Sequence, residues 1–420
     1  MTKNRTIAPE VAPLREIEIV IPERIIGANG LPILVMSGVP NDVFHIQLEF
    51  GGGKMNQNKP LVSSFCADLL FSGTKDFNQL EIQEQLDLLG VFVNCDSGLN
   101  KTQINIYGLV NNAEKALDIV EHVLESASFP EKIFDQHRKS ALQKHSINLE
   151  KNSYVAQREF LQALYPQSAP GKLAESEDFE LIKAQDCKSF YNAFIKNRLE
   201  QVIVIGNMKS STLSYLDTLF AKRHGVLEPV EDIPIIHNPK TLSVDKPDAV
   251  QSALRIGFVL FTPKHADYFE FDVLETILGG YFGSRLMQNL REDKGYTYGI
   301  GSGVTLFDQT GYFFISAEVG KGFKQEAMDA IQLEINRLRD EPIGEEELQL
   351  ARSYIQGQLL KSSDGPFAMM NQYLFASRFD LPHDHLSQFL QMLEKITPEK
   401  LQELAIKYLN WDNMSKIVVG

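Results

Sequence analysis

The chain has 420 residues, enough for two domains that each have a hydrophobic core. Its 43% hydrophobic and 23% charged residues are typical of a globular protein, and its net charge of −14 argues against a nucleic-acid-binding surface. No apolar run approaches the roughly 18 residues of a membrane span, and no signal-peptide core precedes Pro9 and Pro13. We therefore expect a cytoplasmic protein without a membrane span.

The three cysteines, Cys66, Cys95 and Cys187, are widely spaced and odd in number. That pattern indicates neither a disulfide framework nor a CxxC metal site. We expect buried free thiols.

The first half of the chain alternates between strand and helix patterns. Alternating or short apolar runs predict strands over 43–50, 91–95, 102–109 and 201–205. Apolar residues at helical spacing predict helices over 61–71, 79–89, 113–124 and 130–164. The last of these should break near Asn152 and Ser153.

The second half repeats that order. Strands are predicted over 251–261, 298–306, 311–319 and 415–419, and helices over 268–278, 284–291, 326–338, 345–360 and on to about 408. Hairpin turns near Gly98 and Asp308 lie about 210 residues apart, so order rather than identity repeats. This predicts an α+β fold of two homologous domains, each an antiparallel sheet packed with helices.

The join between the two halves is predicted at 228–246. Pro229, Pro234 and Pro239 come at five-residue intervals there, so no continuous helix can form. This places an N-terminal domain at 1–227 and a C-terminal domain at 247–420. The alternative is a long surface loop inside one domain.

A first motif lies in the run Ser64-Phe65-Cys66-Ala67-Asp68-Leu69-Leu70-Phe71-Ser72-Gly73-Thr74. It resembles the signature of the pitrilysin, insulinase and mitochondrial processing peptidase family, which reads His-Phe-x-Glu-His, two residues, then Phe-x-Gly-Thr. Four positions match, namely Phe65, Phe71, Gly73 and Thr74. The family's two His positions are Ser64 and Asp68 here, and its catalytic Glu position is Ala67.

These replacements remove the chemistry of the motif. Two imidazoles one helical turn apart can hold a zinc ion, and a neighbouring Glu can activate its bound water. Ser64 is a poor ligand, Ala67 cannot move a proton, and Asp68 alone is one weak ligand. The resemblance places the third ligand near Lys144, where residues 140–147 contain no carboxylate. We therefore expect no metal and no other cofactor in this chain.

A second motif lies in the other half, as Leu278-Gly279-Gly280-Tyr281-Phe282-Gly283-Ser284-Arg285-Leu286 followed by Leu290-Arg291-Glu292-Asp293-Lys294-Gly295-Tyr296-Thr297-Tyr298. It is similar to the family's C-terminal pattern, in which an Arg, and a Tyr seven residues later, reach the substrate at the zinc of another domain. Arg291 and Tyr298 match those positions and are the expected catalytic residues. Without the resemblance they read as an exposed helix-end cation and an ordinary strand tyrosine.

A third pattern, His122-x-x-Glu125, has the spacing of a partial zinc motif. Ser126 stands where the final His belongs, and the pair lies on a different helix from the first motif. We do not expect a metal site there.

The resemblance implies a non-zinc subunit of a heteromeric zinc metallopeptidase. A homologous partner would carry the zinc, and this chain would supply Arg291, Tyr298 and half of a chamber for a peptide substrate. The first alternative is a non-catalytic structural or binding protein of the same fold, which gives no clear reason to retain the Arg and Tyr pair. The second is a self-sufficient hydrolase rebuilt from Ser64 and Asp68, which needs a positioned base and oxyanion donors.

Overall fold

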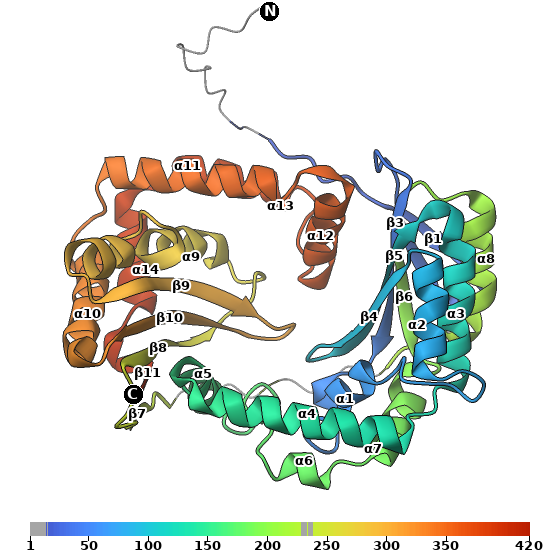
Figure 1. The fold of residues 1–420 in the computed structure, drawn as a ribbon. Coiled ribbons are helices and arrows are strands. Elements are labelled where there is room, and N and C mark those ends of the chain that lie inside the picture. Colours follow the sequence, from blue (N-terminus) through green and yellow to red (C-terminus); the bar gives the residue numbers. More distant parts are fainter. Residues whose placement is uncertain (1–13, 15, 228–232, 234–237) are drawn as a thin grey trace, which may run out of the picture.

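The computed structural model describes residues 14, 16–227, 233 and 238–420. Two sheets, each packed with helices, lie on opposite sides of the molecule and are joined by long helices (Figure 1). The predicted α+β fold of two related domains is confirmed. None of the helices in the described part of the chain is long and apolar enough to cross a bilayer.

The first sheet has six strands in the order β1-β2-β6-β3-β5-β4. Their bounds are Glu23–Ile26, Pro32–Met36, Val43–Gly51, Phe92–Ser97, Lys101–Leu109 and Leu199–Ile205 for β1 to β6. Helices α1 (Val62–Asp68), α2 (Gln79–Leu88), α3 (Ala113–Ser126), α7 (Ala184–Phe190) and α8 (Ser210–Phe220) bury one face of this sheet. Alternation along β3 puts Phe44, Ile46 and Leu48 in this core, so His45, Gln47 and Glu49 lie on the other face.

The second sheet has five strands in the order β7-β11-β8-β10-β9. Their bounds are Thr241–Val244, Gln251–Leu260, Thr297–Leu306, Gly311–Gly320 and Ser415–Val419 for β7 to β11. Its core is closed by α9 (Tyr268–Glu275), α10 (Lys324–Asp340), α11 (Glu345–Lys361), α13 (His385–Lys395) and α14 (Pro398–Tyr408). Helix α6 (Asp178–Leu181) is a single turn beside α4.

Both sheets are mainly antiparallel, as predicted, and each also contains one parallel pair. Strand β2 pairs in parallel with β6, and β11 pairs in parallel with β7. In both pairs, strands far apart in the sequence lie side by side. A pattern read over neighbouring residues does not reveal such pairs.

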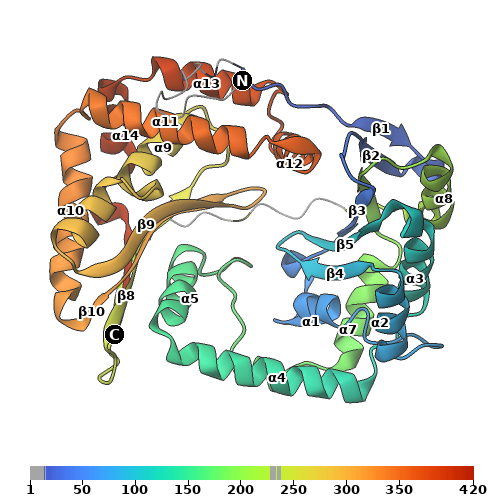
Figure 2. The same ribbon diagram turned by 45° about the horizontal axis from the view of Figure 1, so that its top comes forward.

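The two domains exchange helices, in that each domain packs one helix against the sheet of the other. Helix α4 (Glu131–Glu150) runs along one side of the molecule and delivers α5 (Asn152–Leu164) to the second sheet, where Phe160 shares a core with Ile417 and Val419. On the opposite side α12 (Gly365–Arg378) follows α11, and its Met370 packs against Ile203 of the first sheet (Figures 1 and 2). The predicted break near Asn152 is confirmed, and it is where the chain passes from one domain to the other.

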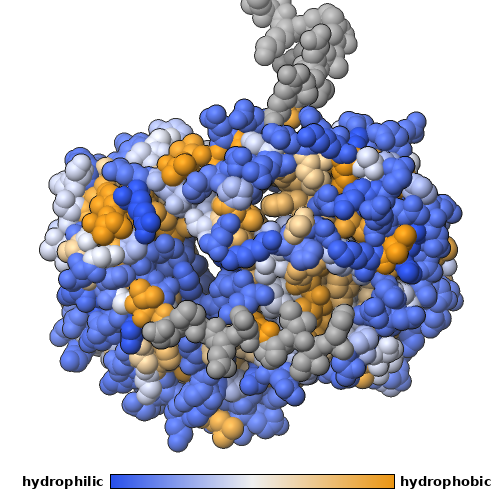
Figure 3. All heavy atoms as spheres, turned by 180° about the vertical axis from the view of Figure 1, so that it is seen from behind, coloured by the Kyte–Doolittle hydropathy of each residue, from blue (hydrophilic) through white to orange (hydrophobic). Residues whose placement is uncertain are grey.

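The two predicted hairpin turns meet. Asn100, in the β4–β5 turn, donates from Nδ2 to Asp308 in the β9–β10 turn. Asp308 also accepts from Nε of Arg378, at the end of α12. One carboxylate therefore ties both sheets and an exchanged helix together. Seen from behind, the surface is hollowed between the two halves (Figure 3).

The predicted linker at 228–246 is only partly described. Residues 228–232 and 234–237 lie outside the described residues, and strand β7 lies within its last part. The boundaries at 227 and 247 stay a prediction.

The three cysteines are free. Cys66 and Cys187 are buried as predicted, and burial raises the pKa of the Cys187 thiol to about 12. Cys95 is half-buried.

Candidate functional site

The first motif lies on α1, and its side chains are used within the fold. The Ser64 hydroxyl donates to the carbonyl of Leu61 over 3.0 Å, and Ala67 is buried in the core. Asp68 Oδ2 lies 3.2 Å from Nε2 of His137 on α4. A contact between side chains of two helices therefore occupies the place where the resemblance puts the second zinc ligand.

The matched residues of this motif have structural roles. Phe65 is buried and contacts the His137 ring edge-on, with 4.7 Å between ring centroids. Thr74 Oγ1 accepts from the backbone N–H groups of Asp76 and Phe77, which closes the turn after α1. The scaffold of the motif is therefore intact without its metal ligands.

The residues present do not fit zinc. Lys144, at the expected position of the third ligand, is an exposed cation on α4. Across the described ranges, no group of three or more His, Cys, Asp or Glu side chains is arranged to hold a metal ion.

The second motif is built from two π-helical turns, a form that is frequent at functional sites. The first covers Thr276–Gly280 and the second covers Met287–Asp293, within and just beyond the short helix predicted over 284–291. The i→i+5 bond from Lys294 N–H to the Asn289 carbonyl closes the second turn. Arg285 anchors the segment to α11 through two hydrogen bonds to Glu347, of 2.8 and 2.9 Å.

Arg291 lies in the second π-helical turn with its side chain 36% exposed. Its guanidinium lies 4.7 Å from the centroid of the Phe282 ring, a cation–π contact. Its Nε lies 3.5 Å from Glu292 Oε1. These contacts hold the guanidinium, while most of its five donors have no partner in the part of the chain that the structure describes.

Tyr298 lies on a β-bulge near the start of β9, an edge strand of the second sheet. Val319 pairs with Thr297 and Ala317 pairs with Ile300, so β9 has one extra residue here. The Thr297 hydroxyl donates to the Glu318 carbonyl over 2.6 Å and accepts from the Gly299 N–H over 3.1 Å. Bulges of this kind redirect a side chain. Tyr298 is 89% exposed, and its hydroxyl has no hydrogen-bond partner among the described residues.

Tyr298 borders a cavity of about 630 Å³ that sequence reasoning missed. Its walls include Arg255 on β8, Ser316 on β10 and Ser153 at the start of α5. Burial lowers the pKa of Arg255, whose guanidinium lies 5.2 Å from the Phe314 ring centroid. The available signal was a single basic residue in the middle of the apolar strand 251–260.

Two carboxyl groups lie beneath the second motif. Burial, together with a smaller effect of nearby Asp272, raises the pKa of Glu275 to about 7. Burial also raises the pKa of Asp272 to about 6. Glu275 Oε1 accepts from the hydroxyl of Ser302 on β9 over 2.7 Å, which connects α9 to the strand that carries Tyr298.

The structure does not join the two motifs. Within the described ranges, no hydrogen bond, ion pair or ring contact links Arg291 or Tyr298 to α1, and the two motifs lie on different domains (Figures 1 and 2).

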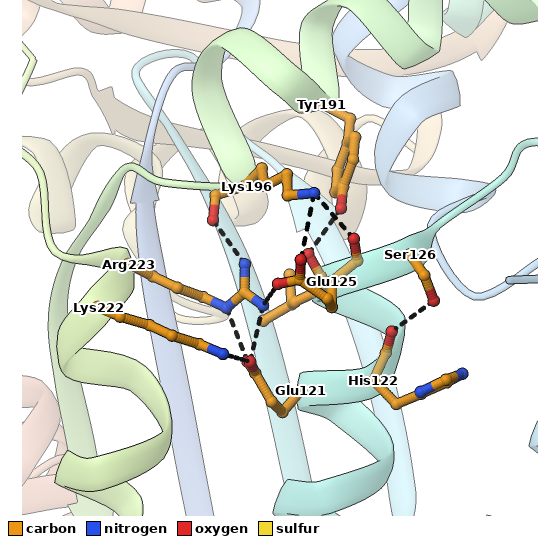
Figure 4. A network of polar contacts seen from close by, with 9 residues as sticks. Glu121, His122, Glu125, Ser126, Tyr191, Lys196, Lys222 and Arg223 are labelled. Atoms are coloured by element: carbon orange, nitrogen blue, oxygen red, sulfur yellow. Dashed lines mark hydrogen bonds and ion pairs between the residues drawn. The ribbon is translucent and has the colours of Figure 1, made fainter. Parts of the chain in front are cut away.

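Glu125 belongs to a structural network rather than a metal site, and His122 lies on the same helix beside that network (Figure 4). Arg223 is 1% exposed and makes bidentate hydrogen bonds to Glu121 together with one to Glu125, of 2.7 to 2.8 Å. His122 points away from this cluster toward Asp76, 3.4 Å from its Nε2. The network ties α3 to the turn after α8.

Two family patterns match the chain. Residues 34–173 match the insulinase pattern (peptidase family M16), and residues 182–355 match the peptidase M16 inactive domain. An uncharacterized zinc protease, YmxG, of Bacillus subtilis is 22% identical over 383 residues, covering 90% of this chain and 93% of that protein. A Helicobacter pylori protein named non-peptidase homolog YmxG is 25% identical over 278 residues, covering 62% of each.

Solved structures share the fold. A peptidase M16 inactive domain from Pseudomonas fluorescens superposes with a TM-score of 0.83 at 20% identity, covering 96% of this chain and 98% of that one. The periplasmic protease PqqL from Escherichia coli superposes with a TM-score of 0.74 at 14% identity, covering 99% of this chain and 49% of that one.

Proposed function

We propose that this chain, which belongs to the insulinase family of peptidases (peptidase family M16), is the non-zinc subunit of a heteromeric zinc metallopeptidase. In this proposal a homologous partner carries the zinc, and this chain presents Arg291 and Tyr298 to the peptide held there. The zinc-motif positions of this chain are occupied by Ser64, Ala67 and Asp68. Relatives named as inactive or non-peptidase homologues support a non-catalytic version of the fold.

One observation carries the proposal, namely the exposure of Tyr298. A tyrosine that serves only the fold buries its ring and pairs its hydroxyl. Tyr298 instead projects from a bulge that Thr297 holds, with 89% of its surface free. This arrangement leaves a phenol ready for a ligand that comes from outside the chain.

The two side chains suit different tasks. The Tyr298 hydroxyl can donate a hydrogen bond to a substrate carbonyl oxygen as negative charge develops on it in the transition state. The Arg291 guanidinium is a rigid fork of donors that can hold backbone carbonyls in the ground state as well. Zinc, when bound by the partner, would polarise the carbonyl and activate water. This chain moves no proton in that scheme.

A structural or binding role is the second candidate. The relative named non-peptidase homolog and the lack of a metal-ligand cluster in the described residues favour it. In that case Arg291 and Tyr298 would contact a bound protein rather than a substrate at zinc.

Co-expression with a homologous chain that has an intact zinc motif tests the proposal. We expect the two chains to elute together and to bury an interface on the order of 2,000 Å² or more, typical of obligate partners. Peptidase activity should require both chains. If the two chains elute separately, and this chain does not change the activity of the zinc-bearing one, the proposal is wrong.

A further inference from the structure

A second cavity lies on the opposite domain from Arg291 and Tyr298. It measures about 1,020 Å³ and lies over the face of the first sheet that the covering helices leave open. The exchanged helix α12 forms its opposite wall, and the joined turns at Asn100 and Asp308 close one side. Its volume reaches the upper end of the range for ligand sites.

A buried carboxylate organises the floor of this cavity. Glu49 is 5% exposed, in the middle of β3. Its oxygens accept from Nε2 of three glutamines on three neighbouring strands: Gln47 on β3 at 2.8 Å, Gln103 on β5 at 2.9 Å, and Gln201 on β6. Lys101 adds an ion pair of 3.1 Å and also contacts Glu200.

This arrangement fixes which way each glutamine amide points. A carboxylate can only accept hydrogen bonds, so each glutamine must turn its NH₂ group toward Glu49. The three Oε1 atoms are then directed away from Glu49, and each NH₂ keeps a second N–H group. The cavity floor therefore carries three oriented primary amides, each with an acceptor and a second donor that have no hydrogen-bond partner among the described residues.

Such amides match the peptide group. A backbone amide also has one donor and one acceptor, so a glutamine side chain can pair with it whatever the neighbouring side chains are. Gln103 and Gln201 flank Glu49 on adjacent strands, so they lie roughly 10 Å apart, about the length of three extended residues. An extended peptide that crosses the strands can meet both amides.

We propose that this amide floor is a second peptide-binding site, which holds an extended, uncharged stretch of polypeptide by its backbone. The inference deepens the proposed function and rests on it for the nature of the ligand. The lining has no net charge that would select an ionic ligand, because its carboxylates Glu49, Asp96 and Asp308 are balanced by Arg24, Lys101 and Arg378, and Lys101 and Arg378 are already paired. An unfolded polypeptide would thus be held on the first sheet, away from Arg291 and Tyr298.

Fluorescence anisotropy on the isolated, full-length chain tests the site. The probe is a labelled, uncharged peptide of serine, threonine and alanine, and its control is the same peptide with N-methyl groups on alternate backbone amides. We expect the parent peptide to bind, and N-methylation to weaken binding by at least about tenfold, because each lost hydrogen bond costs roughly fivefold. No binding, or equal binding of both peptides, would overturn the proposal.

Variants localise the site. The triple change of Gln47, Gln103 and Gln201 to Leu should weaken binding by at least about tenfold, whereas Gln83→Leu on the outer helix α2 makes the same chemical change at an exposed position and should leave binding unchanged. Thermal unfolding checks that each variant is folded. Because the N-methylated probe is measured on the wild-type chain, the site remains testable if the triple variant fails to fold. Wild-type binding by a folded triple variant would overturn the proposal.

The binding assay separates this inference from the proposed function. It uses neither a partner chain nor Arg291 and Tyr298. Peptide binding by the isolated chain, together with wild-type turnover by the Arg291 and Tyr298 variants, would support the amide floor as a peptide-binding site. It would also refute a catalytic role for Arg291 and Tyr298. Loss of turnover in those variants, without peptide binding by the isolated chain, would support their catalytic role and refute the peptide site on the amide floor.

Discussion

Replacing Glu275 by Gln should make the protein more stable at neutral and alkaline pH. Glu275 is 7% exposed, and burial raises its pKa from 4.5 to about 7. Ionisation of this carboxyl group is therefore unfavourable in free energy in the folded protein, whereas the unfolded chain ionises it freely. Gln has the same shape and keeps an Oε1 atom that can accept from the Ser302 hydroxyl.

The sign and size follow from linkage. Because its pKa is raised, the Glu275 carboxyl group contributes most to folding stability below about pH 4.5, and this contribution is lost as the pH rises from about 4.5 to 7. A pKa difference of about 2.5 corresponds to about 3 kcal/mol above pH 7. Glu275→Gln should therefore gain about 3 kcal/mol at about pH 8 and only about 1 kcal/mol at about pH 5. Asp272 remains in both proteins and changes stability in the same direction with pH.

Urea unfolding followed by circular dichroism at these two pH values measures the effect. The matched control is Glu326→Gln, on the exposed side of the first turn of α10, which should change stability by no more than a few tenths of a kcal/mol. A stability difference between Glu275→Gln and wild type that does not grow with pH would refute the reasoning.

Three further predictions concern the scaffold. Thr297→Val should cost about 1–2 kcal/mol in urea unfolding and lower kcat in the two-chain complex, because it removes the hydroxyl that holds the bulge. Thr297→Ser keeps the hydroxyl and should restore both stability and kcat. A wild-type kcat in the Val variant would contradict a positioning role. Arg223→Met should cost about 3 kcal/mol by removing the buried bidentate partner of Glu121, whereas Lys222→Met, at an exposed cation that also contacts Glu121, should cost less than about 0.5 kcal/mol. The dialysed chain should contain no stoichiometric zinc by metal analysis, and zinc that disappears on Asp68→Ala would disprove this.

Much of the fold could be predicted because local patterns repeat along the chain. The order of strands and helices, the two hairpins and the break near Asn152 all follow from periodicity and turn residues. The parallel pairs and the exchange of α5 and α12 could not, since both depend on packing between residues far apart in the sequence. The hairpin of β1 and β2 was also missed.

The candidate site could likewise be predicted only in part from the sequence. Motif spacing could select Arg291 and Tyr298, but the bulge that exposes Tyr298 depends on hydrogen bonds between β9 and β10. The pairing of Asp68 with His137 joins two helices, and the amides around Glu49 come from three strands. Neither arrangement leaves a pattern along a single segment.

Steady-state kinetics of Tyr298→Phe in a reconstituted two-chain complex tests the proposed role of this chain most directly. We expect kcat to fall by about 10²–10³ with little change in KM, because the phenol interaction strengthens in the transition state. Arg291→Ala should raise KM as well, and Tyr215→Phe, whose hydroxyl bonds Asp118 on an outer helix, should keep wild-type rates. Wild-type rates for both Tyr298→Phe and Arg291→Ala would contradict a catalytic contribution and favour the structural or binding role.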